Sequence, residues 1–162
     1  MKKMIMLSLL VFGSMAGSSW KIVSADITRY RCLIQLTNYG GEGAYVIASL
    51  VKPDGNYEKT LFVGGDEEEW YPDLPTWYEF YESMGEDIDG ITGASIQSGS
   101  RKVAMLEIDT EKLNVGYRLR FESSVEDGLY HTKDIELELS DEIVGKTIEG
   151  SGYIRYVRII TK

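Results

Sequence analysis

Cysteine and histidine are scarce in this chain of 162 residues, which contains only Cys32 and His131. A single cysteine excludes an intramolecular disulfide, and the pair cannot supply the four ligands of a structural zinc site. The alternating apolar pattern around Cys32 indicates an inward-facing strand residue rather than a reactive thiol. No Ser-His-acid pattern surrounds His131, and we predict no catalytic and no metal-binding residue.

Long hydrophobic runs are absent apart from one near the N-terminus. Two lysines precede an apolar stretch over residues 5–16, which is shorter than the roughly 20 residues that a spanning helix needs. Small or compact residues follow at 23–25, the positions that a signal peptidase reads. We therefore predict a cleaved signal peptide over residues 1–25 and a single domain over residues 26–162. A retained membrane anchor is the alternative.

Positive charge is also scarce, because the chain has 17 Lys and Arg residues but 26 Asp and Glu residues. Removal of residues 1–25 takes away three lysines and no acid, so the formal net charge changes from −9 to −12. The mean field of such a domain repels nucleic acid and anionic membrane surfaces, so we expect neither as a partner. We expect an exported, periplasmic or otherwise extracytoplasmic protein with no direct membrane insertion after cleavage.

Strand patterns dominate the predicted domain. Cys32, Ile34 and Leu36 alternate with polar residues, which is the period of a half-buried strand. Further β-rich runs, most of them separated by Gly or Asp/Asn, occupy residues 45–51, 57–63, 103–108, 117–122, 131–139 and 153–160. About seven short strands at this spacing predict an all-β, immunoglobulin-like β-sandwich.

One segment breaks the strand pattern. Trp77, Tyr81 and Met84 recur at helical spacing, and Asp73 or Thr76 offers a side-chain cap at the start. We predict a short helix or aromatic loop that covers one end of the sandwich.

The stretch DGITGAS, residues 89–95, has the composition of a loop that another protein could enter and modify. Ser95 offers a hydroxyl that can form a phosphoester, and Gly93 and Ala94 leave room for close approach. Asp89 and Thr92 can hydrogen-bond within the loop and shape it. Asp-Gly and Thr-Gly pairs also form ordinary turns, so a purely structural turn stays open.

The pattern D-x-x-[S/T]-G-A-[S/T] in DGITGAS resembles the acceptor motif of bacterial proteins modified by FAD:protein FMN transferase. In those proteins the last hydroxyl carries FMN through a phosphoester bond. The resemblance implies FMN on Ser95, with Asp89, Thr92, Gly93 and Ala94 as the surrounding cofactor site.

A longer resemblance covers about residues 30 to 140. The chain is similar to DUF2271, a family of predicted periplasmic domains of unknown function, whose members resemble the immunoglobulin-like domain of the flagellar hook-cap protein. The similar stretches are residues 44–47, 54–61, 74–77, 89–99 and 116–122. The family's association with PepSY-type membrane proteins and flavin transferases implies an extracytoplasmic electron-transfer setting.

The chain departs from the family pattern at three places. Ser95 replaces the usual threonine, which keeps the hydroxyl. Residues 97–99 replace a proline-glycine pair, and residues 103–106 replace a tryptophan-containing strand.

The resemblance implies an electron carrier with covalent FMN, whose partners are FAD:protein FMN transferase and a PepSY-type membrane redox protein. We expect no enzymatic activity of its own, since the redox chemistry belongs to the cofactor. Nearby aromatic residues could flank a flavin, but we interpret them as core or lid packing; they are Trp70, Tyr71, Trp77 and Tyr78. Residues 66–69 form an acidic loop that we interpret as solvated, with a weak calcium site left open. The alternative is a non-redox periplasmic binding or assembly module.

Overall fold

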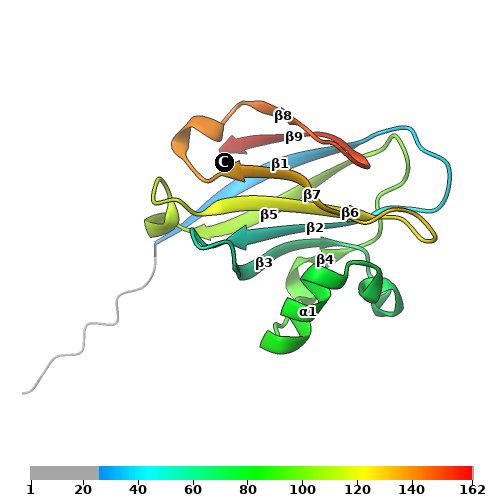
Figure 1. Ribbon diagram of the computed structural model, residues 1–162. Coiled ribbons are helices and arrows are strands. Elements are labelled where there is room, and N and C mark those ends of the chain that lie inside the picture. The colour runs from blue at the N-terminus through cyan, green and yellow to red at the C-terminus, as the bar shows by residue number, and fades with distance from the viewer. Residues whose placement is uncertain (1–25, 162) are drawn as a thin grey trace, which may run out of the picture.

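The computed structural model describes residues 26–161, which form two packed β-sheets with a helix against one of them (Figure 1). One sheet has the strand order β5-β1-β9-β8 and the other β4-β3-β2-β6-β7. The strands are β1 (Ile27–Leu36), β2 (Tyr45–Val51), β3 (Tyr57–Gly64), β4 (Thr92–Gly93), β5 (Arg101–Asp109), β6 (Arg118–Ser124), β7 (His131–Glu138), β8 (Thr147–Glu149) and β9 (Ile154–Thr161).

These strands confirm the predicted all-β sandwich. The seven predicted strands correspond to β1, β2, β3, β5, β6, β7 and β9, and the sequence pattern missed only the two short strands β4 and β8. Apart from the β3–β4 contact, every pairing between named strands is antiparallel. The predicted signal peptide lies outside the described residues. Within residues 26–161, no helix has the length and apolarity required to cross a membrane.

The core lies between the two sheets and follows the alternation seen in the sequence. On β1, Cys32 and Ile34 are fully buried and face Phe121 and other apolar residues in the same core cluster. Burial raises the pKa of the Cys32 thiol to about 12, so the thiolate does not form near neutral pH. Cys32 is therefore an inward-facing core residue, as predicted.

The outer face of the five-stranded sheet is covered by α1 (Pro75–Met84) (Figure 1). Trp77 is fully buried in a second apolar cluster with Tyr45, Ile47 and Val63 from β2 and β3. Because both faces of the sheet are covered at this point, every residue of β2 is buried. The predicted position at one end of the sandwich is wrong, since α1 packs on a sheet face.

The start of α1 also differs from the prediction. Leu74 is the N-cap residue and makes no side-chain cap hydrogen bond, so neither Asp73 nor Thr76 caps the helix. Pro75 occupies the first helical turn, where its fixed φ favours helix and its missing N–H costs nothing. Met84 is 61 % exposed and does not belong to the buried stripe.

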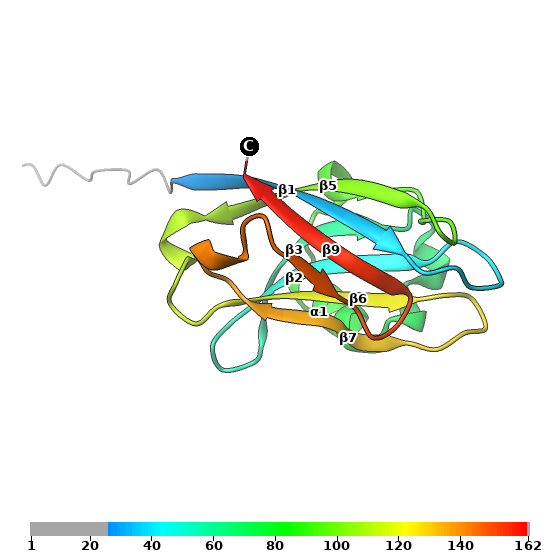
Figure 2. The same ribbon diagram turned by 90° about the horizontal axis from the view of Figure 1, so that it is seen from above.

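The described part of the chain also contains four short 3-10 helices: η1 (Glu68–Asp73), η2 (Asp89–Ile91), η3 (Thr110–Lys112) and η4 (Asp141–Ile143). The outer face of the four-stranded sheet is open, and Figure 2 looks onto it. The two outer faces of the sandwich thus differ: α1 covers one of them, and no described element covers the other.

Candidate functional site

The DGITGAS loop runs along the edge of the five-stranded sheet. Its residues form η2 and then β4, which pairs in parallel with the end of β3. The carbonyl of Gly93 accepts a hydrogen bond from the Gly65 N–H at 2.6 Å. Ile96 and Ala44 exchange two backbone hydrogen bonds of 2.8 and 2.9 Å. Ser95 is therefore held between two fixed backbone positions.

The other motif residues shape the loop in different ways. Thr92 donates its hydroxyl hydrogen bond to the Ile88 carbonyl at 2.8 Å, which closes the turn through η2. Asp89 is exposed, and its N–H donates to the Asp87 carboxylate at 3.2 Å. Ala94 is exposed. A Cβ at Gly93 would lie 3.3 Å from Lys102 Nζ, so the absence of a side chain there leaves room for this lysine.

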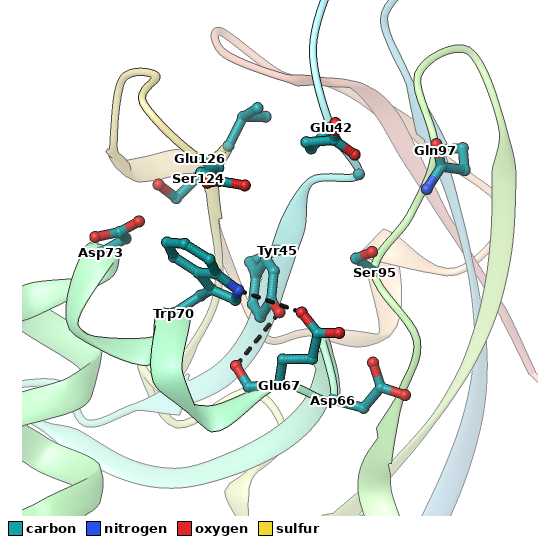
Figure 3. A pocket seen from close by; sticks show the side chains of 12 residues that line it. Glu42, Tyr45, Asp66, Glu67, Trp70, Asp73, Ser95, Gln97, Ser124 and Glu126 are labelled. Atoms are coloured by element: carbon teal, nitrogen blue, oxygen red, sulfur yellow. Dashed lines mark hydrogen bonds between the residues drawn. The ribbon is translucent and has the colours of Figure 1, made fainter.

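Ser95 is half-buried and lines a pocket of about 200 Å³ (Figure 3), which is formed by the segments that precede β2 and follow β3, β4 and β6. Tyr45 and Trp70 line the same pocket. A Cβ at Gly43 would lie only 2.5 Å from Ser95 Oγ. Gly43 therefore provides the space that the Ser95 hydroxyl occupies, and a larger residue at position 43 would displace it.

Two aromatic side chains are fixed around this pocket by Glu67, as the dashed lines in Figure 3 show. Trp70 Nε1 donates to the Glu67 carboxylate at 3.2 Å, and the Tyr45 hydroxyl donates to the Glu67 carbonyl at 3.3 Å. Burial, with the charge of Glu67 next in importance, raises the pKa of Tyr45. Tyr45 thus stays a neutral hydrogen-bond donor at physiological pH.

The pocket is lined by carboxylates and by no lysine or arginine of the described chain. The five acidic residues are Glu42, Asp66, Glu67, Asp73 and Glu126. All four residues of the acidic loop 66–69 are exposed, as predicted. Within residues 26–161, no group of three or more His, Cys, Asp and Glu side chains is arranged to hold a metal ion.

The structure gives the four aromatic residues near the motif different roles. Tyr71 and Trp77 are buried in the cluster beneath α1, and Tyr78 lies half-buried on the helix. Trp70, which the sequence indicated as packing, lines the pocket that contains Ser95. Of the five predicted site residues, only Ser95 lines this pocket. Asp89, Thr92, Gly93 and Ala94 do not, and Thr92 and Gly93 line a separate hollow with Lys102.

Several pocket residues were missed by reasoning from the sequence. Tyr45 begins β2, and Ser124 ends β6 with 3 % exposure. They become neighbours because β2 and β6 pair in antiparallel register, with Tyr45 opposite Ser124. No local motif contains this information, since the two strands are separated by more than 60 residues.

The pocket fits a flavin attached to Ser95 in part. The hydroxyl lines an open pocket with two aromatic side chains, which are suited to stacking against a planar ring. A volume of about 200 Å³ is below the usual range for small-molecule sites, so the pocket would enclose only part of the ring system. The carboxylates oppose a phosphate by like-charge repulsion.

A family model described as "Predicted periplasmic protein (DUF2271)" matches residues 28–156 of the chain. The matched residues include the whole DGITGAS loop and every residue that lines the pocket. This match confirms the expected family and the periplasmic location. No curated protein and no solved structure matches the chain.

Proposed function

The chain belongs to the DUF2271 family of predicted periplasmic proteins, and we propose that this member is an electron carrier with FMN attached covalently to Ser95. The placement of Ser95 is the observation that carries the proposal. Ser95 is the last residue of the acceptor-like motif, and it lines a pocket together with Trp70 and Tyr45. The bound group would supply the redox chemistry, while the protein holds and orients it.

Attachment requires one P–O bond to form and one to break. Ser95 Oγ would form the new bond to the phosphorus of the FMN moiety of FAD. The bond within the FAD diphosphate would break, AMP would leave, and the hydroxyl proton would pass to the transferase or to solvent. The exposed Ala94 and the backbone of Gly93 give the transferase access to the loop.

Charge favours one orientation of the attached group. The acidic pocket repels phosphate, whereas Lys102 lies against Gly93 on the neighbouring part of the loop. Lys102 has no ion-pair partner among the residues described, so its charge is available to a nearby phosphate. The phosphate, bonded to Ser95 Oγ, would therefore lie at the edge of the pocket toward Lys102, with the ring against Trp70 and Tyr45.

This role makes the protein a carrier and not an enzyme with a substrate of its own. Its partners would be FAD:protein FMN transferase, which attaches the flavin, and a PepSY-type membrane redox protein, which exchanges electrons with it. Thr92 would keep the loop in the form that the transferase recognises, through its hydrogen bond to Ile88.

Intact mass spectrometry of the protein from its own host tests the assignment. We expect the wild type to carry one FMN residue, a gain of about 440 Da, on the peptide that contains Ser95. Ser95→Ala should lose this mass while the domain stays folded, because the Ser95 side chain makes no hydrogen bond with another described residue. Ser95→Thr should keep it, since the hydroxyl remains. Covalent flavin in Ser95→Ala would disprove the assignment.

A non-redox binding or assembly module is the second candidate, and the acidic lining of the pocket favours it. Five carboxylates with no lysine or arginine are better suited to a cationic ligand than to an anionic one. An unmodified wild-type mass, measured with the transferase present and active in the host, would establish this class and return DGITGAS to a structural turn.

A further inference from the structure

The open face of the four-stranded sheet combines arginines with exposed apolar side chains. On β1, Arg29 and Arg31 alternate with the buried Cys32 and Ile34, so both arginines point outward. The same alternation on β5 and β9 directs further side chains outward. We call this surface the arginine face; it consists of Ile27, Arg29, Arg31, Leu33, Arg101, Val103, Met105, Glu107, Arg158 and Ile160.

Strand register gathers these residues into rows. Arg31 lies between Met105 on β5 and Ile160 on β9. In the next row, Leu33 lies between Val103 and Arg158. The centre of the arginine face is therefore a mixture of aliphatic and guanidinium groups and not a solvated row of alternating charges.

The apolar part of the face is exposed to an unusual extent. Val103, Met105 and Ile160 are 47, 43 and 43 % exposed, and Ile27 is 46 % exposed. They are four of the seven large apolar side chains that are exposed within residues 26–161. Such a cluster on a single face, unlike scattered exposed residues, marks an interaction surface.

The cations of the face are all arginines, although the described chain also carries lysines elsewhere. Arginine is enriched and lysine depleted at protein–protein interfaces, and a guanidinium binds a carboxylate through two parallel hydrogen bonds. Arg29 pairs with Glu107 at 2.6 Å, and Arg101 Nε donates to Gln35. Arg31 and Arg158 have no ion-pair partner among the described residues.

We propose that the arginine face is a docking surface for an acidic surface of a partner protein. Charge complementarity selects this occupant: the face carries four arginines with Glu107 as an internal counter-ion, while the acidic pocket lies among loops at another part of the molecule. An aliphatic centre with charged residues around it is the arrangement of a protein interface.

A flat sheet face is less suited to a membrane or to a symmetric dimer. The apolar side chains lie in rows along strands and not on protruding loops that could enter a bilayer, and the net charge of −9 opposes approach to anionic lipid. A two-fold dimer through this face would place arginines against arginines.

A photoreactive benzoylphenylalanine at Met105 of the full chain tests the proposal in the host cell. The matched control position is Val115, which is 55 % exposed and lies in the loop between η3 and β6. We expect irradiation to give one discrete protein adduct from position 105 and none from position 115. The cross-linked peptide of the partner should be rich in Asp and Glu.

Charge reversal shows whether the arginines are responsible. Arg31→Glu with Arg158→Glu should lower the yield of the position-105 adduct by about tenfold, because like charges would then meet across the interface. Lys52→Glu with Lys133→Glu makes the same change in net charge away from the arginine face, in the turn after β2 and on β7, and should leave the yield unchanged. Thermal unfolding confirms that both double variants are folded.

Four results would overturn the proposal: no adduct from position 105, an adduct with lipid, an adduct with a second copy, or a yield insensitive to the arginine reversal. The docking surface does not depend on the flavin. Ser95→Ala should therefore retain the position-105 adduct, so that failure of the flavin assignment and failure of the docking surface are distinguishable.

Discussion

Glu122 is a buried carboxylate in β6, outside the pocket that contains Ser95. It has no exposed surface, and it accepts hydrogen bonds from the hydroxyls of Tyr57, at 2.6 Å, and Tyr130. Burial raises the pKa of Glu122, although both hydrogen bonds and the nearby Arg120 favour the charged form. The ionised form is therefore less stable in the folded protein than in the unfolded chain.

This raised pKa predicts how the stability of the protein depends on pH. The contribution of Glu122 is fully present below the ordinary glutamate pKa of 4.5 and is lost as pH rises through the raised folded-state pKa. Glu122→Gln has no such titration. The free energy of unfolding of the wild type, relative to this variant, should thus fall as pH rises above about 4.5.

Thermal unfolding followed by circular dichroism measures this difference across the pH range. Glu138→Gln, at an exposed position on β7, is the control and should show no comparable trend. A constant difference between wild type and Glu122→Gln at all pH values would contradict the predicted linkage.

For single residues, the sequence predicts burial only where a local pattern of alternating polar and apolar residues encodes it. Cys32 was correctly expected to be buried, because its neighbours alternate. Glu122 also ends an apparent alternation, but its burial depends on Tyr57 and Tyr130 from other segments. The position of Trp70 in the same pocket as Ser95 could not be predicted either, because it arises from packing between η1 and loops that are distant in sequence.

At the scale of elements, α1 depends on its packing against the sheet. A helix of ten residues without a side-chain cap is marginal alone, so tertiary contacts must stabilise it. Trp77 supplies the main contact: it is fully buried, its Nε1 donates to Thr60 Oγ1 at 3.0 Å, and its ring stacks on Tyr81. The sequence predicted the helix from apolar spacing, but not the sheet face that it covers.

Trp77→Ala should therefore detach α1 and lower the free energy of unfolding by about 3–5 kcal/mol, through the cavity and the lost donor. Tyr78→Ala is the control on the same helix and should cost about 1 kcal/mol or less, because Tyr78 is only half-buried and bonds to the exposed Glu82. Urea unfolding gives both free energies. Hydrogen exchange should show faster exchange in α1 of Trp77→Ala before β1 is affected, and the opposite order would contradict the role assigned to Trp77.

At the scale of the whole molecule, charge is distributed unevenly. The net charge of −9 predicted an acidic protein, and the acidic lining of the pocket is consistent with that prediction. The sequence did not predict the arginine face, since its arginines at positions 29, 31, 101 and 158 meet only through the β5-β1-β9 pairing. Composition gives the sum of the charges, whereas strand order decides where they lie.

This distribution predicts retention on a cation-exchange resin in spite of the negative net charge. At about 10 mM ionic strength the Debye length is roughly 30 Å, which is long enough for a local patch to act on a sulfonate surface. The wild type should be retained at pH 7 and released by salt, whereas Arg31→Glu with Arg158→Glu should pass through the column. Lys52→Glu with Lys133→Glu has the same net charge as that variant and should still be retained, because its arginine face is intact. Equal elution of the two double variants would mean that net charge alone governs binding, and the arginine face would then have no measurable effect.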